Sequence, residues 1–318
     1  MRRLLLGVFI FFMLFVPAAA FAGAATTAVD ALILGGGSRA AGMAEAFCAI
    51  ADDPSAFYWN PAGLAFQKFS GVTFSYDQRG AIFNDFNASY SLIGYTQSID
   101  SLGTFGLATQ LYNKGTIIVT DSSNNVLGSI DLGMDLVVAL TYSDIFFKNL
   151  GVGVNLKYID TRLSDFYITK SYAVDAGVMY KSSYKDIKVA AVLQNLGPDI
   201  PRKDAAQSDP LPRNLKLGAS IKLLERENSV VTGSADASKP VKNEKDITRT
   251  DNISLSAGAE LVFGKVLIGR VGYTMKEGGI KGLSYGFGVR FRWLQIDYAN
   301  FPLSTDYSAS NFSFTMFF

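Results

Sequence analysis

Apolar side chains occupy every second position along most of the chain after residue 70. In residues 284–293, the apolar members Tyr285, Phe287, Val289, Phe291 and Trp293 alternate with Ser, Gly and Arg. A period of two residues places side chains on one face of a β-strand, whereas a helix repeats about every 3.6 residues. The alternation therefore predicts an all-β protein in which each strand has one apolar face.

The composition favours an apolar face that meets lipid. The chain has 30 Gly, 24 Phe and 15 Tyr and a positive mean hydropathy. No stretch after residue 22 approaches the roughly 20 consecutive apolar residues of a membrane helix. Because every backbone N–H and C=O must be paired inside a bilayer, a sheet that spans it has to close on itself. The sequence thus predicts an antiparallel transmembrane β-barrel in the bacterial outer membrane.

Fourteen segments carry the alternation, an even number as such a barrel requires. They lie at residues 70–77, 84–95, 102–112, 134–143, 151–161, 170–181, 187–195, 213–223, 228–236, 252–263, 265–275, 283–291, 294–300 and 309–318. Short and long connections alternate, and the long stretches 113–133, 196–212 and 237–251 all fall at the same predicted end. Between residues 291 and 294 the apolar parity changes, which indicates a tight turn, with a bulge in one long strand as the alternative.

The first 22 residues have the pattern of a signal peptide. Arg2 and Arg3 precede an apolar run, and Ala20-Phe21-Ala22 forms a small-x-small cleavage site. Loss of Arg2 and Arg3 lowers the basic count from 29 to 27 against 28 acidic residues, a net charge of −1. This balance provides no basic surface for nucleic acid. The predicted organisation is a signal peptide at 1–22, an N-terminal plug at 23–69 and the barrel at 70–318.

The plug prediction rests on one segment that is not β-like. Residues 38–51 are Ala-rich, and Ser38 is placed to cap a helix of about three turns that ends at Asp52-Asp53-Pro54. A barrel of fourteen strands is wider than one that its own side chains can fill, so its lumen needs a plug or remains a channel. We expect this helix and the following Phe57-Tyr58-Trp59-Asn60-Pro61-Ala62 stretch to lie inside the barrel.

Two stretches resemble a known family. Residues 35–65, GGGSRAAGMAEAFCAIADDPSAFYWNPAGLA, are similar to the N-terminal segment of the PorV/PorQ family, and LQIDYANFP at 294–302 resembles its C-terminal region. That family is related to the FadL-type long-chain fatty acid transporters, whose plug also carries an Asn-Pro-Ala motif. The resemblance implies passage of hydrophobic or amphiphilic solutes, with long-chain fatty acids as the leading candidate. The alternative that it implies is a docking or shuttle protein for secreted proteins at the cell surface, related to type IX secretion.

The resemblance also suggests roles for particular residues. Phe57, Tyr58 and Trp59 either line an apolar ligand site or wedge the plug against the wall. Gly103 and Gly106 mark a lateral gap in the wall by similarity to the FadL type. Similarity to bacterial outer-membrane proteins implies that Phe314 and Phe318, on the last strand, are read by the barrel-assembly machinery. The expected partners are therefore outer-membrane lipid, that machinery, a hydrophobic small molecule and secreted surface proteins.

Charged residues are predicted on the lumenal face of neighbouring strands. These are Arg270, Arg290, Arg292, Glu260 and Asp297. The arginines either attract the carboxylate of an amphiphilic ligand or form ion pairs that brace the barrel and hold the plug through Glu45, Asp52 or Asp53. We favour the ion-pair interpretation, because unpaired charges are costly in a partly wet lumen.

The chain contains no histidine. This excludes catalytic arrangements built on Ser-His, Asp-His or Cys-His pairs and metal sites built on imidazole. We therefore expect neither an enzyme nor a cofactor or metal site.

Overall fold

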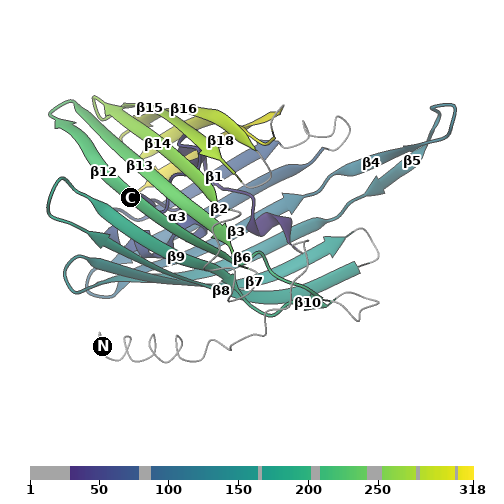
Figure 1. The fold of residues 1–318 in the computed structure, drawn as a ribbon, viewed down its shortest axis with the longest axis horizontal. Coiled ribbons are helices and arrows are strands. Elements are labelled where there is room, and N and C mark those ends of the chain that lie inside the picture. The colour runs from purple at the N-terminus through teal and green to yellow at the C-terminus, as the bar shows by residue number, and fades with distance from the viewer. Residues whose placement is uncertain are drawn as a thin grey trace.

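The computed structural model describes residues 29–78, 87–163, 167–201, 208–241, 253–276, 280–304 and 307–318. The predicted signal peptide lies outside these residues, as do parts of the loops at 196–212 and 237–251. Within the described part of the chain, fourteen antiparallel strands close into one barrel, because the first strand pairs with the last (Figure 1). The predicted fold class is confirmed.

The barrel strands differ from the predicted segments by only a few residues at their ends. They are β1 (Gly71–Gln78), β2 (Ser89–Ile99), β3 (Gly103–Asn113), β6 (Met134–Phe146), β7 (Leu150–Leu163), β8 (Tyr167–Lys181), β9 (Lys188–Leu196), β12 (Asn214–Arg226), β13 (Ser229–Pro240), β14 (Ser254–Phe263), β15 (Leu267–Met275), β16 (Lys281–Phe291), β17 (Leu294–Pro302) and β18 (Ser308–Phe317). Phe291 pairs with Leu294, and Arg292 has a φ of 52°. The tight turn is therefore confirmed, and the alternative of a bulge is wrong.

Two small hairpins stand outside the wall. β4 (Thr116–Thr120) pairs with β5 (Val126–Asp131), and β10 (Ile200–Pro201) pairs with β11 (Ser208–Asp209). The β4–β5 hairpin projects far beyond the barrel (Figure 1). Both hairpins belong to the end with long connections, which is the extracellular end of an outer-membrane barrel, and the short turns mark the periplasmic end.

Burial follows the predicted alternation. In β16, Ser284 is buried, whereas Tyr285, Phe287 and Val289 are exposed on the outside. The outer surface of the other strands likewise consists of large apolar side chains. Because lipid, and not water, covers such a surface, the exposed apolar residues need no further protein partner.

The N-terminal segment lies inside the barrel (Figure 1). It contains the 3-10 helices η1 (Asp30–Leu32) and η2 (Pro61–Phe66) and the short α-helices α2 (Ser38–Gly42) and α3 (Ala56–Trp59). None of the helices in the described residues is long and apolar enough to span a membrane. We call residues 30–66 the plug.

The predicted three-turn helix at 38–51 is wrong. The α-helix ends at Gly42, because Ala44 and Glu45 have φ values of 54° and 66°, outside the right-handed helical region. Ser38 is not the helix cap either: its hydroxyl donates to Asn311 Oδ1 on β18, 2.6 Å away. Contacts with the wall thus replace the helical hydrogen bonds that the local sequence favours.

Candidate functional site

The Asn-Pro-Ala motif forms a local turn that fixes the plug. Asn60 Oδ1 accepts a hydrogen bond from the backbone N–H of Ala62 at 3.0 Å, and Pro61 is the first residue of η2. Pro suits this position because the first N–H of a helix has no partner within the helix. Asn60 Nδ2 also donates to the carbonyl of Cys48 at 3.1 Å. The motif therefore caps η2 and ties two parts of the plug together.

The three aromatic residues divide between packing and a cavity. Phe57, only 2% exposed, belongs to a buried apolar cluster with Tyr90 and Leu92 of β2. Trp59 donates from Nε1 to the carbonyl of Gly36 at 2.9 Å, and Tyr58 donates to that of Leu32 at 3.2 Å. Phe57 thus packs against the wall, whereas Tyr58 and Trp59 also border a cavity described below.

Wall side chains bind the plug backbone at several points. Asn155 Nδ2 of β7 donates to the carbonyl of Phe57 at 2.6 Å, and Gln194 Nε2 of β9 donates to that of Tyr58 at 2.7 Å. Asp236 Oδ2 of β13 accepts from the N–H groups of Phe47 and Cys48, both at 2.8 Å. Such bonds satisfy backbone groups that would otherwise be buried without partners. None of these positions is among the predicted site residues, although each is a polar residue at an inward position of an alternating strand.

Glycines on the inner wall make room for the plug backbone. A Cβ atom on Gly272 would lie 2.4 Å from the carbonyl carbon of Met43, and one on Gly153 would lie 2.3 Å from that of Pro61. Gly258 faces Met43 in the same way at 2.6 Å. Because the opposing atoms are backbone, they cannot rotate away. Plug and wall are therefore in direct contact where the wall lacks side chains.

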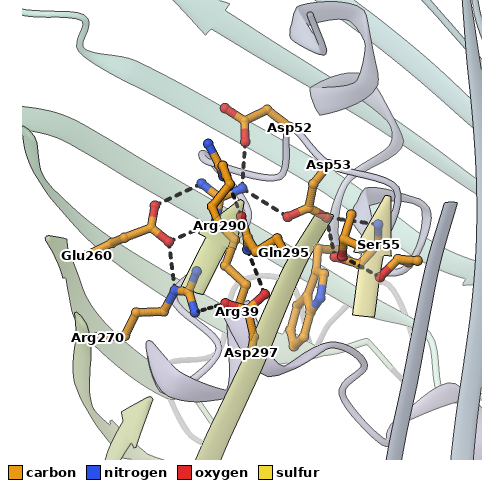
Figure 2. A network of polar contacts seen from close by, with 12 residues as sticks. Arg39, Asp52, Asp53, Ser55, Glu260, Arg270, Arg290, Gln295 and Asp297 are labelled. Atoms are coloured by element: carbon orange, nitrogen blue, oxygen red, sulfur yellow. Dashed lines mark hydrogen bonds and ion pairs between the residues drawn. The ribbon is translucent and has the colours of Figure 1, made fainter. Parts of the chain in front are cut away.

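Arg39 is the centre of an ion-pair network between plug and wall (Figure 2). Its guanidinium binds both carboxylate oxygens of Glu260 on β14 at 3.0 Å, and its Nη1 lies 2.8 Å from Asp52 and 2.9 Å from Asp53. Arg270 on β15 continues the network, 2.7 Å from Glu260 and 2.6 Å from Asp297. Arg39, which connects the predicted charges to the plug, is not among the predicted site residues.

Asp52 is also held in its charged form. Burial alone would raise the pKa of this carboxyl group, but the positive charges of Arg39 and Lys188 outweigh that effect and place the pKa below its usual range. Lys188 Nζ lies 3.4 Å from Asp52 Oδ2. Through Lys188, Asp52 therefore connects the network to a further wall strand, β9.

Of the five predicted lumenal charges, the structure brings four together. Glu260, Arg270 and Asp297 are directly linked. Arg290 Nε donates to Gln295 Oε1 at 2.7 Å, and Gln295 Nε2 donates to Asp297 Oδ2 at 2.6 Å. Arg292 does not face the lumen. It is exposed in the turn between β16 and β17, with its guanidinium 5.6 Å from the centre of the Phe291 ring.

The predicted lateral gap coincides with no break in the wall. β3 pairs in continuous register with both neighbours: Gly106 pairs with Thr96 of β2 and Thr141 of β6, and Gly103 pairs with Ile99 of β2. A Cβ atom on Gly106 would approach Thr141 of β6 at 3.1 Å. An opening at these glycines would require paired strands to separate. Phe314 and Phe318 lie at the outer surface near the periplasmic end.

Among the described residues, cavities adjoin the plug on both its extracellular and its periplasmic side. On the extracellular side, the outer cavity of about 620 Å³ is lined mainly by apolar residues, which include Leu34, Tyr112, Leu132 and Phe301, together with the charged Asp30, Glu45, Lys114 and Lys276. The aromatic cavity beside it, of about 360 Å³, is lined by Tyr58, Trp59, Lys216 and Asp236 among others. On the periplasmic side, the inner cavity of about 360 Å³ borders Arg39, Glu260 and Arg290.

An ion pair separates the two extracellular cavities. Lys276 Nζ lies 2.8 Å from Glu45 Oε1, and both residues line both cavities. Lys216 Nζ lies 4.5 Å from the centre of the Trp59 ring in the aromatic cavity. Apolar walls with a few fixed polar groups are typical of sites for small amphiphilic ligands.

Comparison with solved structures shows the same fold in proteins of low sequence identity. The toluene transporter TbuX of Ralstonia pickettii is 13% identical, with a TM-score of 0.62 over 89% of this chain and 98% of that one. The CymD monoaromatic hydrocarbon channel is 14% identical, with a TM-score of 0.57 over 92% and 99%. The toluene transporter TodX of P. putida is 13% identical, with a TM-score of 0.55 over 83% and 94%. No curated protein sequence matches the chain.

The sequence itself matches one family over most of its length. The family described as type IX secretion system protein PorV matches residues 19–242. This region includes the whole plug and the wall from β1 to the end of β13. The chain belongs to the PorV family and is an outer-membrane β-barrel of the bacterial cell.

Proposed function

We propose that this barrel captures small hydrophobic or amphiphilic solutes at its extracellular end and passes them inward when the plug shifts. The observation that carries this proposal is the outer cavity, whose largely apolar lining includes plug residues 33–35. Long-chain fatty acids remain the leading candidate. The fold shared with the hydrocarbon channels TbuX, TodX and CymD supports this class of solute.

The proposal treats the chain as two cooperating parts. Residues 23–69 act as the movable plug and residues 70–318 as the barrel, in which Phe314 and Phe318 serve as the signal for the assembly machinery. No catalytic step is needed. The plug has to move because it fills the middle of the lumen with closely packed backbone, as at Gly153 and Gly272.

The ion-pair network around Arg39 borders the inner cavity and is close to neutral overall. Three arginines and Lys188 carry four positive charges in this region, and four carboxylates balance them, which supports the bracing interpretation. Arg290 is the one of these arginines that has no ion pair with a carboxylate among the described residues. If a ligand carboxylate enters the inner cavity, we expect it to bind Arg290. Arg292 is the matched control for a substitution of Arg290, because Arg292 lies outside the lumen.

A disulfide between plug and wall tests whether the plug must move. Ser38 Oγ of α2 and Ser313 Oγ of β18 lie 2.9 Å apart. In the double variant Ser38→Cys/Ser313→Cys, oxidation is expected to join plug and wall and to abolish most of the uptake of labelled fatty acid by complemented cells lacking the native protein. Reduction is expected to restore uptake. The two single variants control for loss of the serine hydrogen bonds, and equal uptake in both redox states would contradict the proposal.

A second candidate function is docking of secreted proteins at the cell surface, as the PorV family suggests. The observation that favours it is the β4–β5 hairpin, which exposes Ile118, Val126, Leu127 and Ile130 to at least 49% each. An isolated hairpin with apolar residues on its surface is marginally stable by itself and suits binding to another chain.

Removal of this hairpin separates the two functions. Replacing residues 116–131 by a short Gly-Ser turn is expected to reduce severalfold the secreted proteins cross-linked to the barrel on intact cells, while fatty acid uptake persists. The oxidised Ser38→Cys/Ser313→Cys variant is expected to show the opposite pattern. Unchanged cross-linking after the deletion would exclude the hairpin as the docking site.

A further inference from the structure

The periplasmic end of the barrel carries a regular set of basic residues. Every short connection except the one at 100–102 bears an exposed Lys or Arg in or next to it, as does the entry to β1. We call this set the cationic rim: Lys68, Lys148, Lys185, Arg226, Lys265 and Arg292. All periplasmic connections of the barrel lie within the described residues, so the pattern is complete at this end.

In the part of the chain that the structure describes, these charges are not neutralised. Among the described residues, no carboxylate forms an ion pair with any member of the cationic rim, although ion pairs with carboxylates occur at the nearby Lys181 and Lys222. Together with Lys181 and Lys222, the six members make eight basic side chains at this end, against the acidic Asp100, Asp186, Glu225 and Glu227. The whole chain is nearly balanced, with 29 basic and 28 acidic residues. The positive excess is therefore local.

Exposed aromatic residues accompany the cations. Phe69, Phe147, Tyr184 and Trp293 are each adjacent in sequence to a member of the cationic rim and are 60%, 85%, 66% and 56% exposed. Aromatic side chains concentrate at the level of lipid headgroups, where the ring meets the hydrocarbon boundary. The repeated pairing of one aromatic and one cation fits a membrane interface better than the surface of a soluble partner.

The rim also contains a hollow of headgroup size. It has a volume of about 620 Å³ and is lined by Lys68, Lys181, Lys185 and Lys222 together with Ser182 and Ser183. Asp186 and Glu225 border it as well, but both are paired with Lys222. Lys68 and Lys185 are thus free to meet an anion there.

We propose that the cationic rim binds the phosphate groups of anionic phospholipids in the periplasmic leaflet of the outer membrane. Short turns keep the cations at the depth of the headgroups, and the adjacent aromatics anchor the same turns in the interface. Lysine and arginine side chains near an anionic leaflet are attracted to it, and each adds to the affinity. This lipid contact is independent of the proposed solute passage.

Native mass spectrometry of the purified full-length barrel tests the proposal. The protein is equilibrated with an equal mixture of phosphatidylglycerol and phosphatidylcholine, and the retained lipids are counted. We expect phosphatidylglycerol to be enriched on the native protein. In the triple variant Lys148→Gln/Lys185→Gln/Lys265→Gln, the enrichment is expected to fall by roughly fivefold for each cation removed.

A matched variant removes the same charge from the opposite end. Arg162, Lys170 and Lys281 are exposed at the extracellular side of the barrel, and their replacement by Gln is expected to leave the enrichment within about twofold of the native value. Replacement of the three rim lysines by Arg is expected to preserve it, and a β-rich circular dichroism spectrum confirms folding.

Three results would overturn the proposal. They are unchanged enrichment in the rim variant, an equal loss in the extracellular variant, and displacement of the lipid by inorganic phosphate, which would indicate a site for free anions. If the rim variant retained the lipid enrichment but no longer captured an acidic periplasmic protein, the rim would instead be a protein-docking surface.

Discussion

Replacing Arg39 by leucine is expected to destabilise the folded protein by about 3–5 kcal/mol. The change leaves the buried Glu260 and the partly exposed Asp52 and Asp53 without the guanidinium that binds all three. Removing one partner of a buried ion pair is costly because the remaining charge has lost its water and has no replacement. Urea unfolding of the barrel in lipid vesicles, followed by tryptophan fluorescence, measures the loss.

Arg162→Leu is the control for this prediction. Arg162 pairs with Asp160 at 3.2 Å, but its side chain is half exposed. Exposed ion pairs contribute about 0–1 kcal/mol, so this variant is expected to unfold close to the native urea concentration. A loss below about 1 kcal/mol for Arg39→Leu would show that the network does not hold the plug.

Replacing Gly272 by valine is expected to displace the plug while the barrel remains closed. Valine suits a β-strand, so the wall itself tolerates the change. The new side chain would instead overlap the backbone at Met43, since even a Cβ atom would lie 2.4 Å from its carbonyl carbon. Overpacking of this kind costs about 1–3 kcal/mol, more where backbone has to move. Planar-bilayer recordings are expected to show a large rise in ion conductance.

Gly269→Val is the matched control on the same strand. Gly269 lies three residues earlier in β15, and a Cβ atom there would have no neighbour within 4 Å. Its conductance is expected to equal that of the native protein. If both valine variants conduct alike, the contact at Met43 is not what keeps the lumen closed.

The location of the fourteen strands could be read from the sequence because the alternation is a local property. Within each strand, the alternation of polar and apolar residues shows which positions face inward and which face outward. Even the turn at Arg292 and Trp293 was predicted from a shift in that alternation. The outward apolar face needs no particular partner, since lipid accommodates any such surface. The barrel was therefore predictable without knowledge of which strands touch.

The plug was less predictable. Local propensity favoured one helix over residues 38–51, but only α2, Ser38–Gly42, is α-helical in that range. The backbone of Phe47 and Cys48 binds Asp236 instead, across 189 and 188 residues of sequence. Hydrogen bonds to distant residues thus replace the local hydrogen bonds of a helix. A local sequence pattern cannot predict which of these two sets forms.

The lumenal charges show the same division. The alternation along the strands correctly predicted an inward position for Glu260, Arg270, Arg290 and Asp297. It failed for Arg292, because the turn between β16 and β17 points this residue away from the lumen. Arg39 carried one signal that was overlooked: it is the only basic residue between residues 4 and 67, in a segment expected to lie inside the barrel. A buried cation of this kind requires carboxylate partners nearby.

By itself, the sequence determined the strand number, the apolar exterior and the presence of a non-β segment at the N-terminal side of the barrel. These depend on side-chain polarity along a strand, which neighbouring residues set. Only the tertiary structure decided that Arg39 meets Glu260 and that Met43 rests on Gly258 and Gly272. Those contacts depend on how the plug is positioned against strands more than 200 residues away, and a pattern with a period of two residues contains no information about that position.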